Sequence, residues 1–361
     1  MGQVSSKNVR VEALDLARGV AVALMILSHG VKGLLDFDQI PSWGLVPIHL
    51  VTKFSSSLFI IVFGMALAAA YLPSIGTPAW TKKRNKLLLR GVVVFFWYKV
   101  LTIVEMFWLY TPQEILQTIR YQAFPVYVEI LDFYAIMLLW IPFVLPLWKR
   151  LPLALQITVP VALGWTSTIL YHHFDFWGSE GLRTVLVENE KHYAWGQLSR
   201  GPLVFIGMLL GAPVLRWYPK TKTRLLTASA FLAMSLALVV LFYLKTRGHL
   251  DQELLAIAKN TGKHPPETNF ALFSIGGALL ILAFSIAGGK SLARVLAPIT
   301  LLGKDALQSF ICHISVLFVF YRYLFDYWHS VSYQQALTLS ALLIAVTSLW
   351  IKVVFWFRKH S

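Results

Sequence analysis

EALDLARGVAVALMILSHGVK, residues 12–32, is an apolar segment that carries charge where a membrane helix normally has none. Arg18 and His29 are 11 positions apart. At about 100° per residue this is roughly three turns plus 20°, so both side chains project from one face of a helix. Asp15, three residues before Arg18, shares that face. Ionisable groups inside a membrane cost several kcal/mol unless they face protein or water, so this face indicates a functional site.

The depth of this face follows from the rise of a helix. At about 1.5 Å per residue, Arg18 and His29 are separated by roughly 16 Å along the axis. This is about half of a hydrocarbon core of about 30 Å. The segment therefore predicts a polar track that runs from one membrane surface to near the middle of the membrane.

The composition of the whole chain places it among membrane proteins. The 361 residues are 57% hydrophobic and 14% charged, with a mean hydropathy of +0.64. The apolar segments are continuous and do not alternate, which favours helices over an outer-membrane barrel. The single cysteine, Cys312, excludes an intramolecular disulfide framework and a cysteine-rich metal site. We expect no metal at the site.

Windows of about 20 apolar residues predict an all-α polytopic transmembrane bundle of about ten spans. The chain shows no internal repeat and no separate soluble segment, so residues 1–361 are expected to form a single membrane domain. The spans are expected at residues 13–34, 52–72, 88–109, 126–147, 152–171, 196–215, 224–244, 269–287, 306–325 and 334–356.

The formal net charge of +15 arises from short clusters of Lys and Arg between the apolar segments. This pattern predicts membrane topology and not nucleic-acid binding. The clusters lie at 7–10, 82–86, 149–150, 216–224, 290–304 and 358–359. All of them fall on one side of a ten-span bundle, which the positive-inside rule makes cytoplasmic. Both termini are then cytoplasmic, the protein is integral to the inner membrane, and the first helix is an uncleaved span.

His29 is the candidate catalytic residue of the first span. A neutral imidazole in a low-dielectric cavity can take a proton from a hydroxyl. Arg18 suits a phosphate or carboxylate, because the guanidinium stays charged and offers a planar fork of donors. Two plainer interpretations stay open: His29 as a packing residue, and Arg18 as a surface partner of Asp15 or Glu12.

Other ionisable residues recur inside the expected spans, and four of them are candidates for substrate binding. Glu129 and Asp132 are three residues apart near the outer end of the fourth span, where they either bind an acceptor or meet the aqueous rim. Glu105 lies in the third span and His313 in the ninth. The chain contains no phosphate-binding loop, no His-Glu-x-x-His and no nucleophile elbow, which argues against nucleotide hydrolysis.

Glycine spacing adds one structural expectation. Gly207 and Gly211 are four residues apart in the sixth span. Small residues at this spacing let two membrane helices approach closely. We therefore expect this face of the sixth span to pack against a neighbouring helix.

Three patterns along the chain are informative together. Leu14, Asp15, Arg18 and Gly19 form Leu-Asp-x-x-Arg-Gly, and ten residues separate Arg18 from His29. A late pattern, Leu-Gly-x-x-Ser-Tyr-x-x-Tyr-x-x-His, is matched in spacing by Leu302, Gly303 and His313, while its Ser and two Tyr are replaced by Ala306, Leu307 and Phe310. The second span keeps the glycine of Phe-Phe-x-x-Ser-Gly as Gly64 but has Phe63 in place of the serine.

These patterns resemble those of the integral-membrane acyltransferases of the acyltransferase-3 type. That group includes relatives that succinylate periplasmic glucans, and the chain is also similar to heparan-glucosaminide acetyltransferase-like proteins. The resemblance implies transfer of an acetyl or succinyl type of acyl group from cytoplasmic acyl-coenzyme A to a hydroxyl of an envelope carbohydrate or glycolipid at the outer face. It implies acyl-coenzyme A as a donor substrate and no permanently bound cofactor.

The resemblance also assigns roles within the site. Arg18 would anchor the donor, and His29 would act as general base on the acceptor hydroxyl or accept the acyl group itself. Two alternatives remain: a transporter or flippase of an envelope precursor, and a non-catalytic partner of polysaccharide assembly. The oligomeric state and the identity of the acyl group and acceptor are left open by the sequence.

Overall fold

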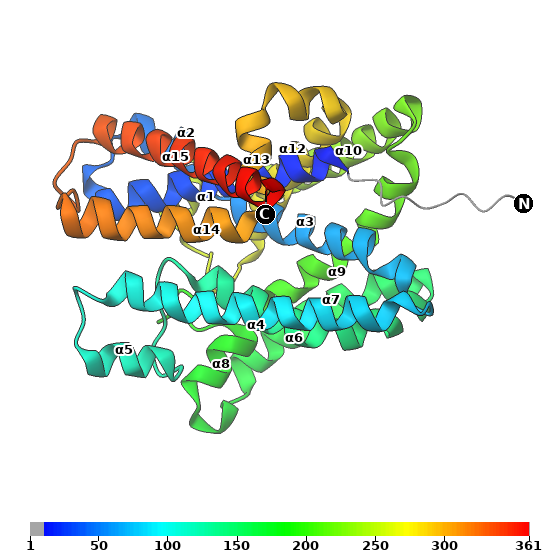
Figure 1. Ribbon diagram of the computed structural model, residues 1–361, viewed down its shortest axis with the longest axis horizontal. Coiled ribbons are helices and arrows are strands. Elements are labelled where there is room, and N and C mark those ends of the chain that lie inside the picture. The colour runs from blue at the N-terminus through cyan, green and yellow to red at the C-terminus, as the bar shows by residue number, and fades with distance from the viewer. Residues whose placement is uncertain (1–10, 361) are drawn as a thin grey trace, which may run out of the picture.

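The computed structural model describes residues 11–360, and every element of regular structure in this part of the chain is a helix (Figure 1). Ten of the helical segments are long and apolar enough to cross a membrane, at the ten places predicted. The protein is therefore an all-α, polytopic membrane protein.

The helices follow one another with short connections. Their bounds are α1 Glu12–Leu34, α2 Ser42–Thr52, α3 Phe54–Ala70, α4 Ala79–Met106, α5 Pro112–Ile119, α6 Glu129–Arg150, α7 Leu153–His173, α8 Glu180–Val187, α9 Gln197–Trp217, α10 Thr221–Thr246, α11 Leu250–Ala258, α12 Thr268–Val295, α13 Ala297–Lys304, α14 Ala306–Ser315, the π-helix η4 Val316–Leu324, and α15 Tyr333–His360.

The bounds of several spans differ from the prediction, and two spans also differ in their internal structure. The second begins at Ser42, ten residues before the expected start, and it is divided at Lys53, where α2 ends and α3 begins. The ninth begins as α14 and continues as the π-helix η4. The short helices α5, α8 and α11 lie in connections for which no helix was expected. Apolar windows find helices that cross the membrane, but they do not resolve breaks within a span.

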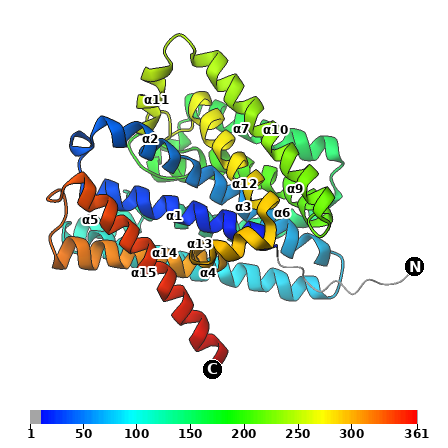
Figure 2. The same ribbon diagram turned by 90° about the horizontal axis from the view of Figure 1, so that it is seen from above.

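The helix α1 lies at the centre of the bundle. It packs against α3 and α12 on one side and against α14 and α15 on another (Figure 2). Its partner α13 approaches so closely that a Cβ on Gly19 would lie 1.9 Å from the carbonyl oxygen of Ile299, and one on Gly303 would lie 1.9 Å from that of Asp15. Only glycine fits at these two positions, so the glycines of both sequence motifs bring α13 against α1.

The predicted close packing of α9 is present, and its partner is α3. A Cβ on Gly207 would lie 2.2 Å from the carbonyl oxygen of Ile61, and one on Gly64 would lie 2.1 Å from that of Val204. By contrast, α7 faces outward, with Pro160 and Ser167 its only buried residues. Exposed apolar side chains on such a helix are suited to contact with lipid.

We name the two ends of the bundle after the two ends of α1. We call the end where Glu12 lies the N-terminal end, and the end where Leu34 lies the far end. The C-terminal part of α15 is at the N-terminal end, because Arg358 Nη1 forms an ion pair of 2.8 Å with Asp305 Oδ2, two residues after Gly303. The backbone N–H of His329 donates to the carbonyl of Leu34 at 2.9 Å, which places the start of α15 at the far end.

Candidate active site

Two histidines from distant parts of the chain meet inside the bundle. His29 Nδ1 lies 3.2 Å from His313 Nε2, and the two rings stack with their centroids 5.4 Å apart. The phenyl ring of Phe310, one turn before His313 on α14, packs edge-on against both imidazoles. The structure thus joins the histidine of the first-span motif to the histidine of the late motif.

The hydrogen bonds fix which nitrogen of each ring carries a proton. His313 Nδ1 lies 2.8 Å from the carbonyl oxygen of Ser309, which only accepts, so His313 Nδ1 carries the hydrogen. The Nε2 of a neutral His313 is then an acceptor, and His29 Nδ1 donates to it. In a neutral His29, Nε2 is then unprotonated. His313 therefore orients His29 as a base, with the lone pair at the nitrogen that points away from the pair.

A cavity of about 220 Å³ lies on the N-terminal side of this pair. Three cationic side chains line it, namely Arg18, Arg90 and Lys304. The rest of its wall is mostly apolar and comes from α3, α4, α6 and α14. A long, thin ligand with an anionic head and an apolar stem would match this combination of charge and shape.

Arg18 is held at the wall of this cavity by α13. Its Nη1 donates to the carbonyl of Gly303 at 3.0 Å and lies 3.7 Å from Asp15 Oδ1. The carbonyl is accessible because glycines occupy both sides of the α1–α13 contact. Asp15 is thus a partner of Arg18, as one of the two sequence interpretations proposed, while Arg18 also borders the cavity.

Two further cavities lie on the far side of the histidine pair. The inner one, about 40 Å³, is lined by His29 together with Ser28, Lys32, Lys53, Glu129, Trp195, Asn260 and Lys263. The outer one, about 290 Å³, shares Ser28, Lys32, Lys53 and Asn260 with it and extends toward Asp36 and His329. Because their linings share these residues, the two cavities adjoin, and together we call them the recess between the far end and His29.

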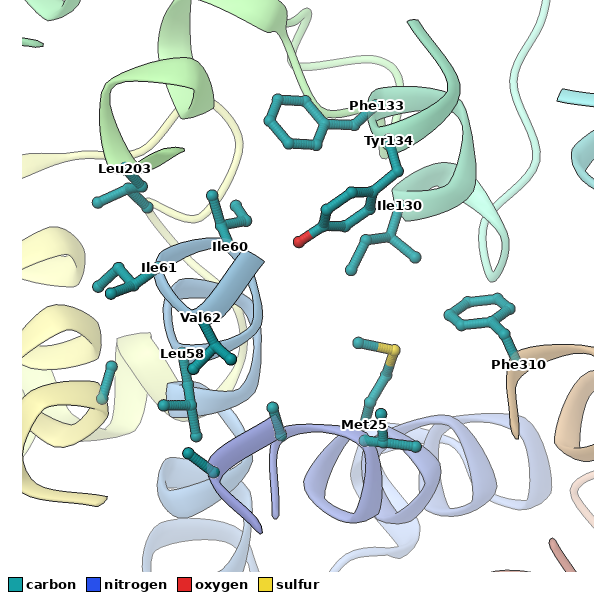
Figure 3. Packing of buried hydrophobic residues seen from close by; sticks show 14 of the residues in the cluster. Met25, Leu58, Ile60, Ile61, Val62, Ile130, Phe133, Tyr134, Leu203 and Phe310 are labelled. Atoms are coloured by element: carbon teal, nitrogen blue, oxygen red, sulfur yellow. The ribbon is translucent and has the colours of Figure 1, made fainter. Parts of the chain in front are cut away.

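A thin apolar partition separates the two sides. Ile130 lines both the N-terminal cavity and the inner cavity, Phe310 lines the former, and Met25 lines the latter. Figure 3 shows Met25, Ile130 and Phe310 converging from α1, α6 and α14, with Tyr134 beside them. The two cavities therefore share the side chain of Ile130 as part of their walls.

The other predicted site residues have different positions. Glu129 lines the inner cavity, and Glu105 lines the outer one. Glu105 also accepts hydrogen bonds from the backbone N–H groups of Val126, at 2.7 Å, and Tyr127, at 3.2 Å. Asp132 accepts a hydrogen bond from the hydroxyl of Tyr121. Glu105 therefore also stabilises the segment that precedes α6. Asp132 is bonded to Tyr121 and does not lie beside His29.

The sequence interpretation overlooked three lysines of the inner cavity. Lys32 lies three residues after His29 on α1, so the helical period alone could have found it. Lys53 lies at the break between α2 and α3, and Lys263 lies in the connection after α11. No spacing in the sequence relates these two residues to His29, because only tertiary packing brings them together.

A buried ionic cluster holds that connection in place over the inner cavity. Glu188 accepts from Arg200 Nε at 2.7 Å and from His264 Nδ1 at 3.0 Å, and Arg200 Nη2 donates to the carbonyl of Lys263. Burial opposes ionisation of Glu188, but the charge of Arg200 and the bond from His264 outweigh it and lower the pKa of Glu188 to about 2. Burial lowers the pKa of His264 to about 4.

This cluster makes stability fall in acid. Below pH about 6.5 the unfolded chain protonates His264 while the folded protein does not, and below about 4.5 the same holds for Glu188. The melting temperature of the purified protein should therefore decline as pH falls from 6.5 toward 2. Glu188→Gln, which leaves Arg200 buried without its partner, should cost about 3–5 kcal/mol at neutral pH and flatten the decline below pH 4.5.

The control for this measurement is Glu190→Gln. The Glu190 side chain accepts from the Tyr171 hydroxyl at 2.6 Å on the exposed surface, so its loss should change stability by less than about 1 kcal/mol. Equal melting temperatures for the two variants at neutral pH would contradict the role given to Glu188.

Comparison with known proteins identifies the family. Residues 11–357 match the family model of the acyltransferase-3 acyltransferase domain, which is nearly the whole chain. No curated protein matches the chain. The chain therefore belongs to the acyltransferase-3 family, and with its ten membrane-length helices it is a multi-pass membrane acyltransferase.

Proposed function

We propose that this protein takes an acyl group of the acetyl or succinyl type from cytoplasmic acyl-coenzyme A and transfers it to a hydroxyl of an envelope carbohydrate or glycolipid. The transfer takes place across the inner membrane, with the acceptor on the outer side. The observation that supports this best is that the cavity on the N-terminal side and the inner cavity beside His29 share Ile130 in their walls, with Met25 and Phe310 next to it.

The donor would enter from the N-terminal end. The basic clusters at 82–86, 149–150, 216–224, 290–304 and 358–359 would lie at that end, which the positive-inside rule makes cytoplasmic. Arg18, Arg90 and Lys304 supply positive charge for the phosphates of coenzyme A. The apolar remainder of the cavity suits the thin pantetheine arm, whose thioester would reach the partition near Phe310.

The acceptor would enter through the recess at the far end. His29 Nε2 takes the proton of the acceptor hydroxyl as its oxygen attacks the thioester carbonyl. The carbon–sulfur bond then breaks, and the coenzyme A thiolate takes the proton from His29. During the step the imidazolium of His29 is stabilised by its hydrogen bond to His313 Nε2. The products are free coenzyme A and an ester of the acceptor hydroxyl. The transferred acyl group is not an aminoacyl group.

The test is acyl-coenzyme A consumption by purified protein in detergent, with an envelope carbohydrate extract as acceptor. We expect release of the coenzyme A thiol together with transfer of a labelled acyl group to the carbohydrate. A transporter or a non-catalytic assembly partner would release no thiol above the rate without protein. That result would reject the proposed function.

A further inference from the structure

We propose that the inner cavity beside His29 is an anion site, in which Lys32, Lys53 and Lys263 hold a carboxylate or phosphate carried by one of the two substrates. The inference rests on the proposed function and narrows its substrate class. One of the two reacting molecules, the acyl group or the acceptor, bears a negative charge within a few ångströms of the reacting atoms.

The first argument is the charge of the lining. Three lysines and one carboxylate, that of Glu129, line the inner cavity. Basic side chains therefore outnumber acidic ones by three to one in this lining. An excess of positive charge in a recess between membrane helices is expensive unless a ligand of opposite charge enters it.

The second argument concerns the partners of the three lysines. Within residues 11–360, none of the three lysines forms an ion pair with a carboxylate. Lys53 Nζ donates to Asn260 Oδ1 at 2.6 Å, and Lys32 Nζ lies over the ring of Tyr193 at 4.0 Å from its centroid. The hydroxyl of Ser56, on the same wall, is buried and has no hydrogen-bond partner in the described part of the chain. An anion supplies several acceptors at once.

The third argument is size. The inner cavity of about 40 Å³ holds a few water molecules, which is the room that a carboxylate or a phosphate needs. The outer cavity of about 290 Å³ leaves space for the rest of a larger molecule. A small anionic group would therefore reach the lysines beside His29, while a sugar ring would stay in the outer recess.

The fourth argument is that the lysines are held in place. Lys53 is tied to Asn260, and the backbone of Lys263 is tied to Arg200 of the ionic cluster around Glu188. Burial lowers the pKa of Lys263 to about 8. Positive charge fixed in advance by other parts of the fold is what selective anion binding requires.

Calorimetric titration of the purified full-length protein in detergent separates the two sources of the anion. One arm compares acetyl-coenzyme A with succinyl-coenzyme A, which differ at the acyl group by one carboxylate. The other arm compares glycerol 3-phosphate with glycerol. The variants are Lys53→Gln and Lys263→Gln, with Lys263→Arg retaining the charge. Lys99→Gln is the matched control, because Lys99 lies over the ring of Tyr121, at 3.8 Å from its centroid, and bonds the carbonyl of Ile119.

If the acyl group carries the charge, succinyl-coenzyme A binds wild type at least about tenfold more tightly than acetyl-coenzyme A. That preference disappears in both Gln variants and persists in Lys263→Arg and Lys99→Gln. If the acceptor carries it, the two donors bind equally, glycerol 3-phosphate binds and glycerol does not, and the phosphate affinity falls about tenfold in the Gln variants. Either pattern supports the anion site.

Gln variants that change neither the donor preference nor phosphate binding would overturn it. That failure is distinct from failure of the proposed function. If only the anion site is wrong, wild type still binds and consumes acetyl-coenzyme A independently of the lysines. If the proposed function is wrong, no acyl-coenzyme A is bound or consumed, and only the titration with glycerol 3-phosphate still reports on the lysines.

Discussion

His29→Ala abolishes acyl transfer and leaves a folded, inserted protein. Loss of a general base lowers a rate by about 10²–10⁴. The side chain borders the inner cavity and is only partly buried, in contrast to the fully buried Ala17 and Ile26 of the same helix. Its removal should therefore affect the reaction far more than the packing. The measurement is coenzyme A thiol release with saturating donor and acceptor.

The matched control is His173→Ala, an exposed histidine at the end of α7, which should keep the wild-type rate. Melting temperature in detergent reports whether His29→Ala is folded. Incubation with labelled donor and no acceptor separates the two routes: a base leaves the protein unlabelled, whereas an acylated His29 retains the label. Near wild-type turnover in His29→Ala would remove this residue from catalysis.

Arg18→Lys weakens donor binding by about ten- to a hundredfold and leaves acceptor binding nearly unchanged. A point ammonium cannot reproduce the bidentate fork of a guanidinium, and charge-assisted hydrogen bonds contribute roughly 1.5–3 kcal/mol. Arg18 lines the cavity on the N-terminal side of the partition, whereas the recess for the acceptor lies on the other side. Titration of acyl-coenzyme A into wild type and variant measures the difference.

Arg216→Lys serves as the control for this titration, because Arg216 lies in the last turn of α9, in a basic cluster at the same membrane surface. Its donor affinity should equal that of wild type. The opposing result is equal donor affinity for Arg18→Lys with lowered thermal stability. It would mean that Arg18 serves only the contacts to Asp15 and Gly303.

The sequence predicted those features of the site that follow a local period. The 3.6-residue repeat places Asp15, Arg18 and His29 on one face of α1, and hydropathy finds all ten spans. Motif spacing selected His313 although the serine and tyrosines around it are replaced. Its contact with His29 is nevertheless a long-range contact, because the two residues are 284 positions apart in the sequence.

Features that depend on tertiary packing could not be predicted. Lys53 and Lys263 line the same cavity as His29 only because the junction of α2 and α3 and the connection after α11 pack beside α1. The sequence likewise gives no sign that Glu105 bonds the backbone at Val126, or that Asp132 is engaged by Tyr121. Isolated charges in apolar spans indicate a polar interior, but tertiary packing determines which groups they bind.

Transfer across a sealed membrane is the most direct test of the central claim that donor and acceptor reach His29 from opposite ends. Vesicles containing the reconstituted protein would hold an envelope carbohydrate extract inside and receive labelled acyl-coenzyme A outside only. We predict that label appears on the enclosed carbohydrate with wild type and not with His29→Ala. Label that reaches only carbohydrate added on the same side as the donor, and never the enclosed carbohydrate, would contradict the account.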